Sequence, residues 1–166
     1  MKSILEAYNE ALAGINVAEN EQIILRYKDP WMCCNFAQHI SSANIKAHQE
    51  IVLLSRVSGF CYYFASNIPG ADINYLEQVV IENKSIQDCC LFATKISGAN
   101  VKAHEKVIIE SKDPRHCYWL ARNAVGVDKQ ILSEIVLESK DQYCIYEFYT
   151  NVDFDKSRYE RLMLFI

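Results

Sequence analysis

Apolar residues recur along this chain with the spacing of an α-helix. Cys33, Phe36, Ala37 and Ile40 stand at positions i, i+3, i+4 and i+7, so one helical face carries all four. Asp29-Pro30 comes directly before them and supplies a side chain that can cap the helix, followed by a proline at its first position. We expect equivalent helices to be capped by Ser85, Asp113 and Asp141.

A second amphipathic helix is predicted after each of these. Ile45, His48, Ile51 and Val52 form its apolar face in one segment, and Asn44 can cap it. The corresponding caps in later segments are Asp72, Asn100 and Asp128. Each pair of helices therefore forms a short helical hairpin.

The hairpin pattern repeats every 28 residues. One register holds Cys33, Cys61, Cys89 and Cys117, and a second holds the turn residues Gly14, Ser42, Gly70, Gly98 and Gly126. The predicted repeats lie near residues 1–28, 29–56, 57–84, 85–112, 113–140 and 141–166, and the first and last match the pattern least well. A two-helix unit cannot bury its apolar face alone, so the units must stack. The sequence predicts an all-α fold, a single α-solenoid domain over residues 1–166 built from about six two-helix repeats.

The repeat also resembles known sequences. Residues 29–140 carry Cys/Tyr-Phe-Ala segments that end in I-x-G-A-D/N-I and continue to V-I-x-E-S-K-D. This pattern is similar to repeats of uncharacterised bacteriophage and bacterial proteins. The resemblance implies a binding scaffold, for example an inhibitor or adaptor that covers a host protein such as a defence component. The last unit departs from the pattern, with Tyr149 at the alanine position and Phe154 at the glycine position.

Charge and composition exclude several classes of function. The formal net charge is -4, so no global basic field attracts nucleic acid or anionic lipid. No apolar run approaches the roughly 20 residues of a membrane span, and the N-terminus lacks a continuous hydrophobic signal core. Seven cysteines, an odd number, favour reduced thiols. We expect a cytoplasmic protein, in the host cytoplasm if a phage encodes it.

The cysteines and histidines could suggest a metal site or a catalytic pair. Residues in equivalent positions of adjacent repeats lie about 8 to 10 Å apart, too far for one zinc ion to bridge. The same spacing separates His116 from Cys144, and the neighbours His116 and Cys117 point to different sides of a helix. His48 and His104 are interpreted as core residues. We therefore predict no metal, no cofactor and no enzymatic activity.

A ladder of basic residues at the ends of the second helices could follow a phosphate backbone. Its members are Lys28, Arg56, Lys84, Lys112 and Lys140. Glu82, Glu110 and Glu138 stand two residues earlier in three units, so the local charges largely cancel. Nucleic-acid binding is the less favoured alternative, and a homo-oligomeric structural protein is another.

Charge is divided unequally between the two kinds of helix. In the four central units the first-helix segments contain six charged residues among 60, and the second-helix segments contain seventeen among 52. Aromatic residues are frequent on the first helices, and the candidate binding residues are Trp31, Tyr62, Tyr63, Tyr118, Trp119 and Tyr146. Charge depletion with aromatic enrichment is typical of interface cores, although such residues also pack on each other between repeats. The sequence favours a non-catalytic scaffold with an unidentified protein partner.

The last residues raise the question of self-association. An apolar run, with no further unit to cover it, consists of Leu162, Met163, Leu164, Phe165 and Ile166. Uncovered apolar surface tends to associate. We expect this run either to form a homodimer through the C-terminal end or to fold back onto the last hairpin.

Overall fold

The computed structural model describes residues 2–154, and this part of the chain is helical throughout. It contains eleven α-helices and, within the same residues, no β-strand, which confirms the predicted all-α class. Contacts divide the chain into two compact units, Met1–Asn83 and Lys84–Ile166. The first unit holds α1 to α6, and the second holds α7 to α11.

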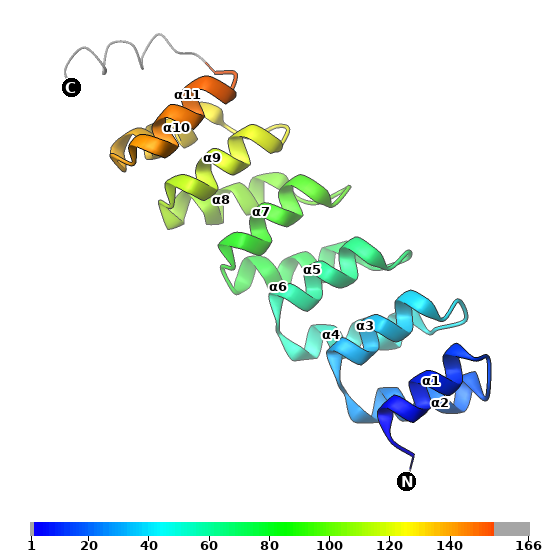
Figure 1. Cartoon of the computed structure of the whole chain (residues 1–166). Helices are drawn as coiled ribbons and strands as arrows, with labels where there is room; N and C mark the ends of the chain where they lie inside the picture. The colour runs from blue at the N-terminus through cyan, green and yellow to red at the C-terminus, as the bar shows by residue number, and fades with distance from the viewer. Residues whose placement is uncertain (1, 155–166) are drawn as a thin grey trace, which may run out of the picture. The chain divides into compact units, whose positions relative to one another are not determined.

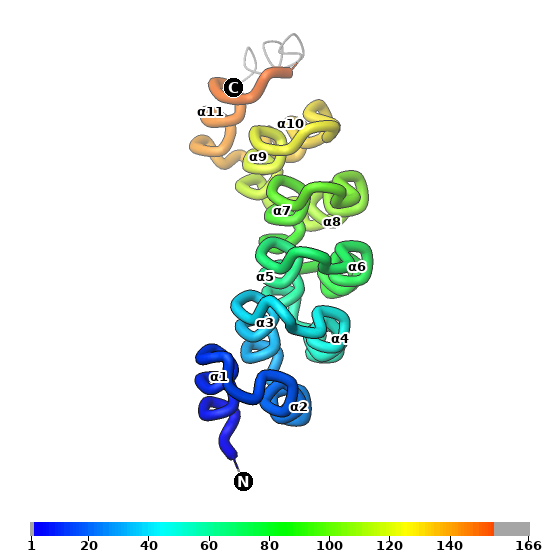
Figure 2. The backbone as a smooth tube through the Cα atoms, turned by 90° about the vertical axis from the view of Figure 1, so that its right-hand side faces the viewer, coloured from blue at the N-terminus to red at the C-terminus, as the bar shows by residue number. Residues whose placement is uncertain are grey.

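The helices of the first unit form two layers (Figures 1 and 2). One layer consists of α1 (Ile4–Leu12), α3 (Pro30–His39) and α5 (Ser58–Asn67). The other consists of α2 (Val17–Tyr27), α4 (Ile45–Ser55) and α6 (Ile73–Glu82). Helices that are neighbours in a layer pack side by side, and each odd-numbered helix packs against the even-numbered helix that follows it. This packing between neighbours is consistent with a helical repeat.

The second unit has the same two-layer arrangement. Its odd-numbered layer consists of α7 (Ile86–Lys95), α9 (Pro114–Asn123) and α11 (Gln142–Asn151). Its even-numbered layer consists of α8 (Val101–Ser111) and α10 (Lys129–Glu138). Helix α9 packs against both of its layer neighbours, and α8 packs against α10 (Figure 2).

Most of the predicted caps form. The Asp29 carboxylate accepts a hydrogen bond from the Met32 backbone N–H at 2.9 Å, and Asn44 caps α4 in the same way through the Ala47 N–H at 3.2 Å. Side-chain caps also form at Asn100, Asp113, Asp128 and Asp141. The predictions for Ser85 and Asp72 are wrong, because neither side chain caps its helix. The Ser85 hydroxyl instead donates to Asp88, at 2.6 Å.

Left-handed backbone conformations end the even-numbered helices. Residues of the predicted basic ladder adopt them, at φ angles of 51° to 59°, and are Lys28, Arg56, Lys84, Lys112 and Lys140. Such conformations cost little at a helix end, where the left-handed residue lets the chain turn back. The ladder residues therefore stop each even-numbered helix and direct the chain into the next odd-numbered one.

The turns inside the hairpins rely on glycine. Ile68-Pro69-Gly70-Ala71 forms a turn that the Ala71 N–H closes onto the Ile68 carbonyl at 3.2 Å, with Gly70 at φ 83°. Proline and glycine at these two positions are typical of a type II turn, which needs a positive φ at its third residue. Ser42 takes the place of glycine in an earlier hairpin without a positive φ.

The core lies between the two layers of each unit. Its largest members from the odd-numbered helices are Phe36, Phe64, Phe92 and Leu120, all fully buried. Cysteine and alanine occupy the neighbouring buried positions, for example Cys33 and Ala37. These small side chains let adjacent odd-numbered helices pack closely.

Two predictions fall on residues outside the described part of the chain. The second helix of the last repeat and the apolar run Leu162–Ile166 both lie beyond residue 154. The predicted homodimer through this end therefore stays a prediction. Within residues 2–154, no helix combines the length and the apolar character that a membrane crossing requires.

Candidate protein-binding surface on the odd-numbered helices

The core positions determine which residues of the odd-numbered helices reach the surface. Because Cys33 and Phe36 are fully buried on α3, Trp31 and Gln38 lie on its outer side. Trp31 is 47% exposed, although an indole is among the side chains that gain most from burial. Neither α3 nor α5 contains an Asp, Glu, Lys or Arg residue. The outer surface of these two helices is therefore aromatic and uncharged.

In the first unit, aromatic side chains connect α3 with α5. The rings of Trp31 and Tyr63 lie 5.5 Å apart between centroids, at an interplanar angle of 59°. The Tyr63 hydroxyl donates to the Gln38 side-chain oxygen at 2.6 Å. Tyr62 and Tyr63 are half-buried. In the first unit, the exposed Trp31 ring thus packs against Tyr63, whose hydroxyl is held by Gln38.

In the second unit, the predicted aromatics differ in their surroundings. Tyr118 is held by neighbours, since its hydroxyl donates to Glu147 at 3.0 Å and accepts from the Arg122 guanidinium at 2.7 Å. Partial burial and the Glu147 carboxylate raise the pKa of Tyr118 above its usual value. Tyr146 on α11 is 65% exposed, and Trp119 on α9 is half-buried. Tyr118 is therefore a packing residue, whereas Tyr146 faces solvent.

The structure brings the six predicted residues into two groups, one in each unit. Trp31 and Tyr63 are in ring contact, and Tyr62 is on the same helix as Tyr63. In the other unit Tyr118 and Trp119 are on α9, and Tyr146 is on α11. Tyr143, an aromatic residue of α11 outside the six candidates, is also strongly exposed.

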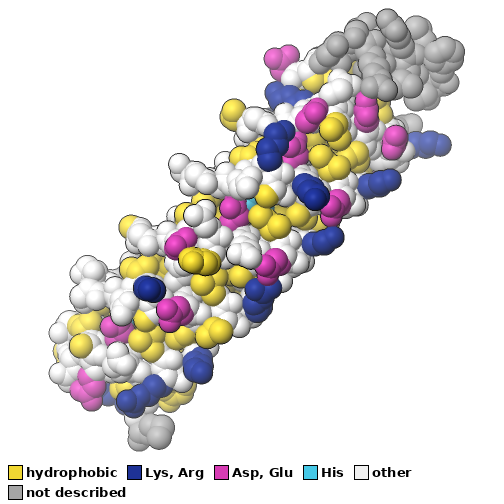
Figure 3. Space-filling model, turned by 180° about the vertical axis from the view of Figure 1, so that it is seen from behind, with side chains coloured by type: hydrophobic (Ala, Val, Ile, Leu, Met, Phe, Trp, Pro, Cys, Tyr) yellow, Lys and Arg dark blue, Asp and Glu magenta, His cyan; other side chains and the backbone are white. Residues whose placement is uncertain are grey.

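Two members of the basic ladder form ion pairs with the even-numbered helices. The Arg56 guanidinium contacts the Glu82 carboxylate at 2.6 Å, and the Lys84 ammonium contacts Glu110 at 3.2 Å. Hydrogen bonding to Arg56 lowers the pKa of Glu82. On the face shown in Figure 3, basic and acidic side chains lie interspersed. Arg56 and Lys84 of the basic ladder are therefore each paired with a carboxylate.

A set of buried polar residues, which the sequence analysis did not identify, joins consecutive even-numbered helices. The Glu21 carboxylate of α2 accepts the Asn44 backbone N–H at 2.6 Å, at the start of α4. Gln49 of α4 accepts the Asp72 N–H at 2.8 Å, and Glu105 of α8 accepts the Asp128 N–H. An acceptor at a helix N-terminus satisfies an otherwise unpaired N–H and opposes the positive end of the helix dipole. The signal was in the sequence, because Glu or Gln recurs at residues 21, 49, 77 and 105.

The cysteines are sealed inside the protein. All seven belong to the described residues, are buried and form no disulfide. Burial raises the pKa of Cys33, Cys34, Cys90 and Cys117 to about 12. A thiol with a raised pKa is a poor nucleophile and a poor metal ligand, because both roles need the thiolate. Residues 2–154 contain no group of three or more His, Cys, Asp or Glu side chains placed to hold a metal ion.

The histidines have structural surroundings. His48 is fully buried, stacks on Phe36 at 5.0 Å between centroids, and shares a hydrogen bond of 3.1 Å with Glu21. Burial lowers its pKa, and the opposing effect of Glu21 is the smaller one. His116 lies 3.1 Å from Asp113, the cap of its own helix. These contacts favour the interpretation of His48 as a core residue.

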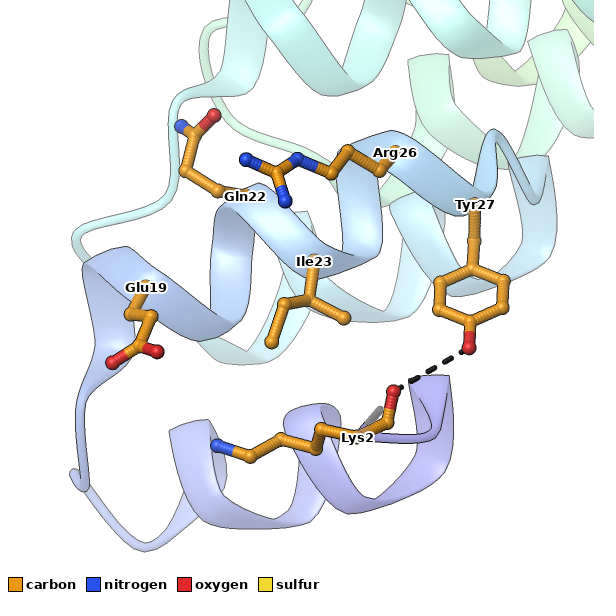
Figure 4. A pocket seen from close by; sticks show the side chains of 6 residues that line it. All are labelled: Lys2, Glu19, Gln22, Ile23, Arg26 and Tyr27. Carbon is orange, nitrogen blue, oxygen red and sulfur yellow. Dashed lines mark hydrogen bonds between the residues drawn. The ribbon is translucent and has the colours of Figure 1, made fainter.

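The surface contains cavities in both units. A cavity of about 640 Å³ beside α1 and α2 is lined by Lys2, Glu19, Gln22, Ile23, Arg26 and Tyr27 (Figure 4). The Tyr27 hydroxyl donates to the Lys2 backbone carbonyl at 3.4 Å across it. Cations and a carboxylate line this cavity together, so it has no single charge preference. A smaller, more apolar cavity of about 320 Å³ lies between α7 and α9, next to Trp119.

Comparison of the chain with family models, with curated proteins and with solved structures gave no match.

Proposed function

We propose that this chain is a non-catalytic scaffold that binds another protein through the outer surface of its odd-numbered helices. The observation that carries the proposal is the exposure of Trp31 and Tyr146 on helices with few charged residues. Large aromatic side chains at charge-depleted sites are the residues that most often dominate binding energy at protein interfaces. The paired charges of the even-numbered helices support a protein partner over a nucleic acid, because Arg56 and Lys84 already have carboxylate partners.

We also propose that the chain is an α-solenoid of about six two-helix repeats with a 28-residue period. The first residues of five odd-numbered helices support this proposal, since they are residues 30, 58, 86, 114 and 142. The even-numbered helices begin at residues 17, 45, 73, 101 and 129, with the same spacing. The α1 helix departs from this spacing, because it begins at Ile4. Extended surfaces of such stacks are well suited to protein binding.

Within this class, the resemblance to bacteriophage repeats favours an inhibitor or adaptor that covers a host protein. Such a protein acts by occupying a surface and needs no reactive group of its own. The buried thiols, with their raised pKa values, are compatible with this role.

Affinity capture tests the proposal. The immobilised full chain is exposed to a lysate of its native cell, and captured proteins are identified by mass spectrometry after washes at low and high salt. We expect one protein to be retained through both washes, because aromatic contacts are little affected by salt, and to be lost with Trp31→Ala or Tyr146→Ala. Tyr75→Ala is the matched control, since Tyr75 is an exposed aromatic residue of the even-numbered α6. Capture of nucleic acid that is released steeply by salt would contradict the proposal.

A further inference from the structure

The cavity between α7 and α9 lies where the corresponding helices of the first unit, α3 and α5, have two aromatic rings in contact. Helices α3 and α7 have identical bounds after a shift of 56 residues, and so do α5 and α9. With this shift Tyr63 corresponds to Trp119, and Trp31 corresponds to Gln87. In the first unit the Trp31 indole lies against Tyr63, at 5.5 Å between ring centroids. In the second unit Gln87 and Trp119 line a cavity.

The lining of this cavity suits an aromatic side chain. Leu91 replaces the polar Asn35 of the first unit, and the buried Cys90 corresponds to the buried Cys34. Leu91, Cys90 and the indole of Trp119 therefore provide an apolar base and one aromatic wall. The volume of about 320 Å³ is at the small end of the range of roughly 300 to 1,000 Å³ that ligand pockets occupy. It matches one side chain of a partner better than a large cofactor.

The rim of the cavity adds a charge preference. Arg115 lies at the position where the first unit has Gly59, so only the second unit has a cation there. No Asp or Glu is among the residues that line the cavity; the acidic residue that Arg115 influences, Asp141, lies outside the lining. A carboxylate beside the incoming aromatic side chain would therefore be attracted to Arg115.

We propose that the cavity between α7 and α9 binds an aromatic side chain of the partner protein, with an acidic residue next to it, in the arrangement that Trp31 has against Tyr63. This proposal rests on the proposed scaffold function and assigns a subsite to it. The model for this contact is the tilted Trp31–Tyr63 pair between the neighbouring helices α3 and α5. Offset or tilted aromatic pairs attract each other beyond the effect of the area they bury.

A peptide titration of the full chain tests the subsite. The probe is the tetrapeptide Gly-Asp-Trp-Gly, with acetylated and amidated ends, and the readout is the indole N–H signal of each tryptophan in the ¹⁵N-labelled protein. Trp31 and Trp119 are the two tryptophans, so Trp31 serves as the internal control. We expect the Trp119 signal to shift and saturate while the Trp31 signal stays in place. The peptide Gly-Asp-Ala-Gly should shift neither signal.

Filling the cavity gives the sharpest comparison. Gln87→Trp places an indole where the first unit has Trp31, and should weaken peptide binding roughly tenfold or more. Lys106→Trp adds an indole at an exposed position of α8 that does not line the cavity, and is the matched control, with binding unchanged. Should Gln87→Trp fail to fold, Gln87→Phe serves the same purpose. Arg115→Gln should remove a preference of about two- to fivefold for Gly-Asp-Trp-Gly over Gly-Lys-Trp-Gly, the size expected of one exposed ion pair.

Several results would overturn the subsite. One is a Trp119 signal that does not shift and saturate with the peptide. Another is equal peptide binding by Gln87→Trp and the parent. A third is a larger Trp119 shift with the oligonucleotide (dT)₁₀ than with the peptide. Failure of the scaffold function is distinct from these, because it would leave partner capture insensitive to Trp31→Ala and Tyr146→Ala. If those two substitutions abolish capture and Gln87→Trp does not, the scaffold function stands and the subsite is wrong.

Discussion

The odd-numbered and even-numbered helices solve the same packing problem with different chemistry. Even-numbered helices connect to each other through polar groups, such as the Glu21 acceptor at the start of α4 and the Arg56–Glu82 ion pair. Odd-numbered helices pack through small cysteine and alanine side chains and leave Trp31 and Tyr146 exposed. Polar groups that are already paired gain little from a partner, whereas exposed aromatic rings gain from burial. Exposed apolar residues such as Leu54 and Tyr75 also occur on the even-numbered helices, so the layers differ mainly in how much charge surrounds such residues.

The largest expected effect is the difference between deleting a whole repeat and deleting half of one. Removing residues 57–84 joins Arg56 to Ser85, and should leave a shorter folded protein because Arg56 and Lys84 have the same left-handed conformation. Removing residues 57–70 instead joins the end of an even-numbered helix to the start of another, and should abolish cooperative unfolding. Circular dichroism with thermal melting distinguishes the two. Equal damage by both deletions would refute the 28-residue repeat.

Because the cysteines of the odd-numbered helices are buried, we expect the stability of the protein to fall in alkali. Unfolded thiols ionise near pH 8.5, while Cys33, Cys34, Cys90 and Cys117 keep a pKa of about 12 when folded. The stability is therefore complete below about pH 8.5 and falls as the pH rises toward 12, by up to about 1.4 kcal/mol per thiol and pH unit.

Urea unfolding at a series of pH values measures this loss. The double variant Cys33→Ala/Cys117→Ala should show a smaller dependence on pH, because alanine does not ionise. A free energy of unfolding that stays constant between pH 8 and 10.5 would show that these thiols are not sealed.

The polar connection between even-numbered helices predicts a matched pair of variants. Glu21→Ala leaves the Asn44 N–H and the His48 ring without their acceptor, and should lower the free energy of unfolding by about 2 to 4 kcal/mol. Glu21→Gln keeps an acceptor, as Gln49 does for Asp72, and should cost less than about 1 kcal/mol. Chemical denaturation of both variants gives the comparison. Similar losses in the two would mean that charge, and not the hydrogen bond, is what matters at this position.

The smallest expected effect concerns His48 in acid. Burial lowers its folded pKa below the unfolded value near 6.5, so stability is complete above that pH and is lost as the pH falls toward the folded pKa. His48→Leu, which copies the buried Leu76 and Leu132, should weaken this loss. Thermal melting between pH 7 and 5 measures it. A parent and variant that lose stability equally would assign the acid sensitivity to other groups.

Much of the fold follows from sequence patterns, because helical spacing and caps are local signals. Asp29-Pro30 and Asn44 mark the starts of α3 and α4 for reasons that involve only neighbouring residues. The burial of Glu21 and Glu105 could not be predicted from neighbouring residues in the sequence. A carboxylate in a helix is normally solvated, and only the next helix N-terminus, 23 residues away in the sequence, makes its burial favourable.

The candidate site was less predictable than the fold. Aromatic content singled out the odd-numbered helices as candidates, but could not show which rings are exposed. Tyr118 is engaged because Glu147 and Arg122 happen to reach its hydroxyl, and these are contacts of side chains on two helices. The cavity beside Trp119 arises from a substitution of Trp31 by Gln87 in an equivalent position. Such an empty space becomes visible only when the two helix pairs are compared in three dimensions.

The dissociation constants of the captured partner, measured for single alanine variants of both layers, test the central claim most directly. Trp31→Ala and Tyr146→Ala represent the odd-numbered helices, and Leu54→Ala and Tyr75→Ala represent exposed apolar residues of the even-numbered helices. We predict losses of about 1 to 4 kcal/mol in binding free energy for the first pair and no measurable change for the second, with all four proteins folded. Loss of binding in Leu54→Ala or Tyr75→Ala, with Trp31→Ala and Tyr146→Ala binding as the parent does, would place the interface on the other layer and contradict the account.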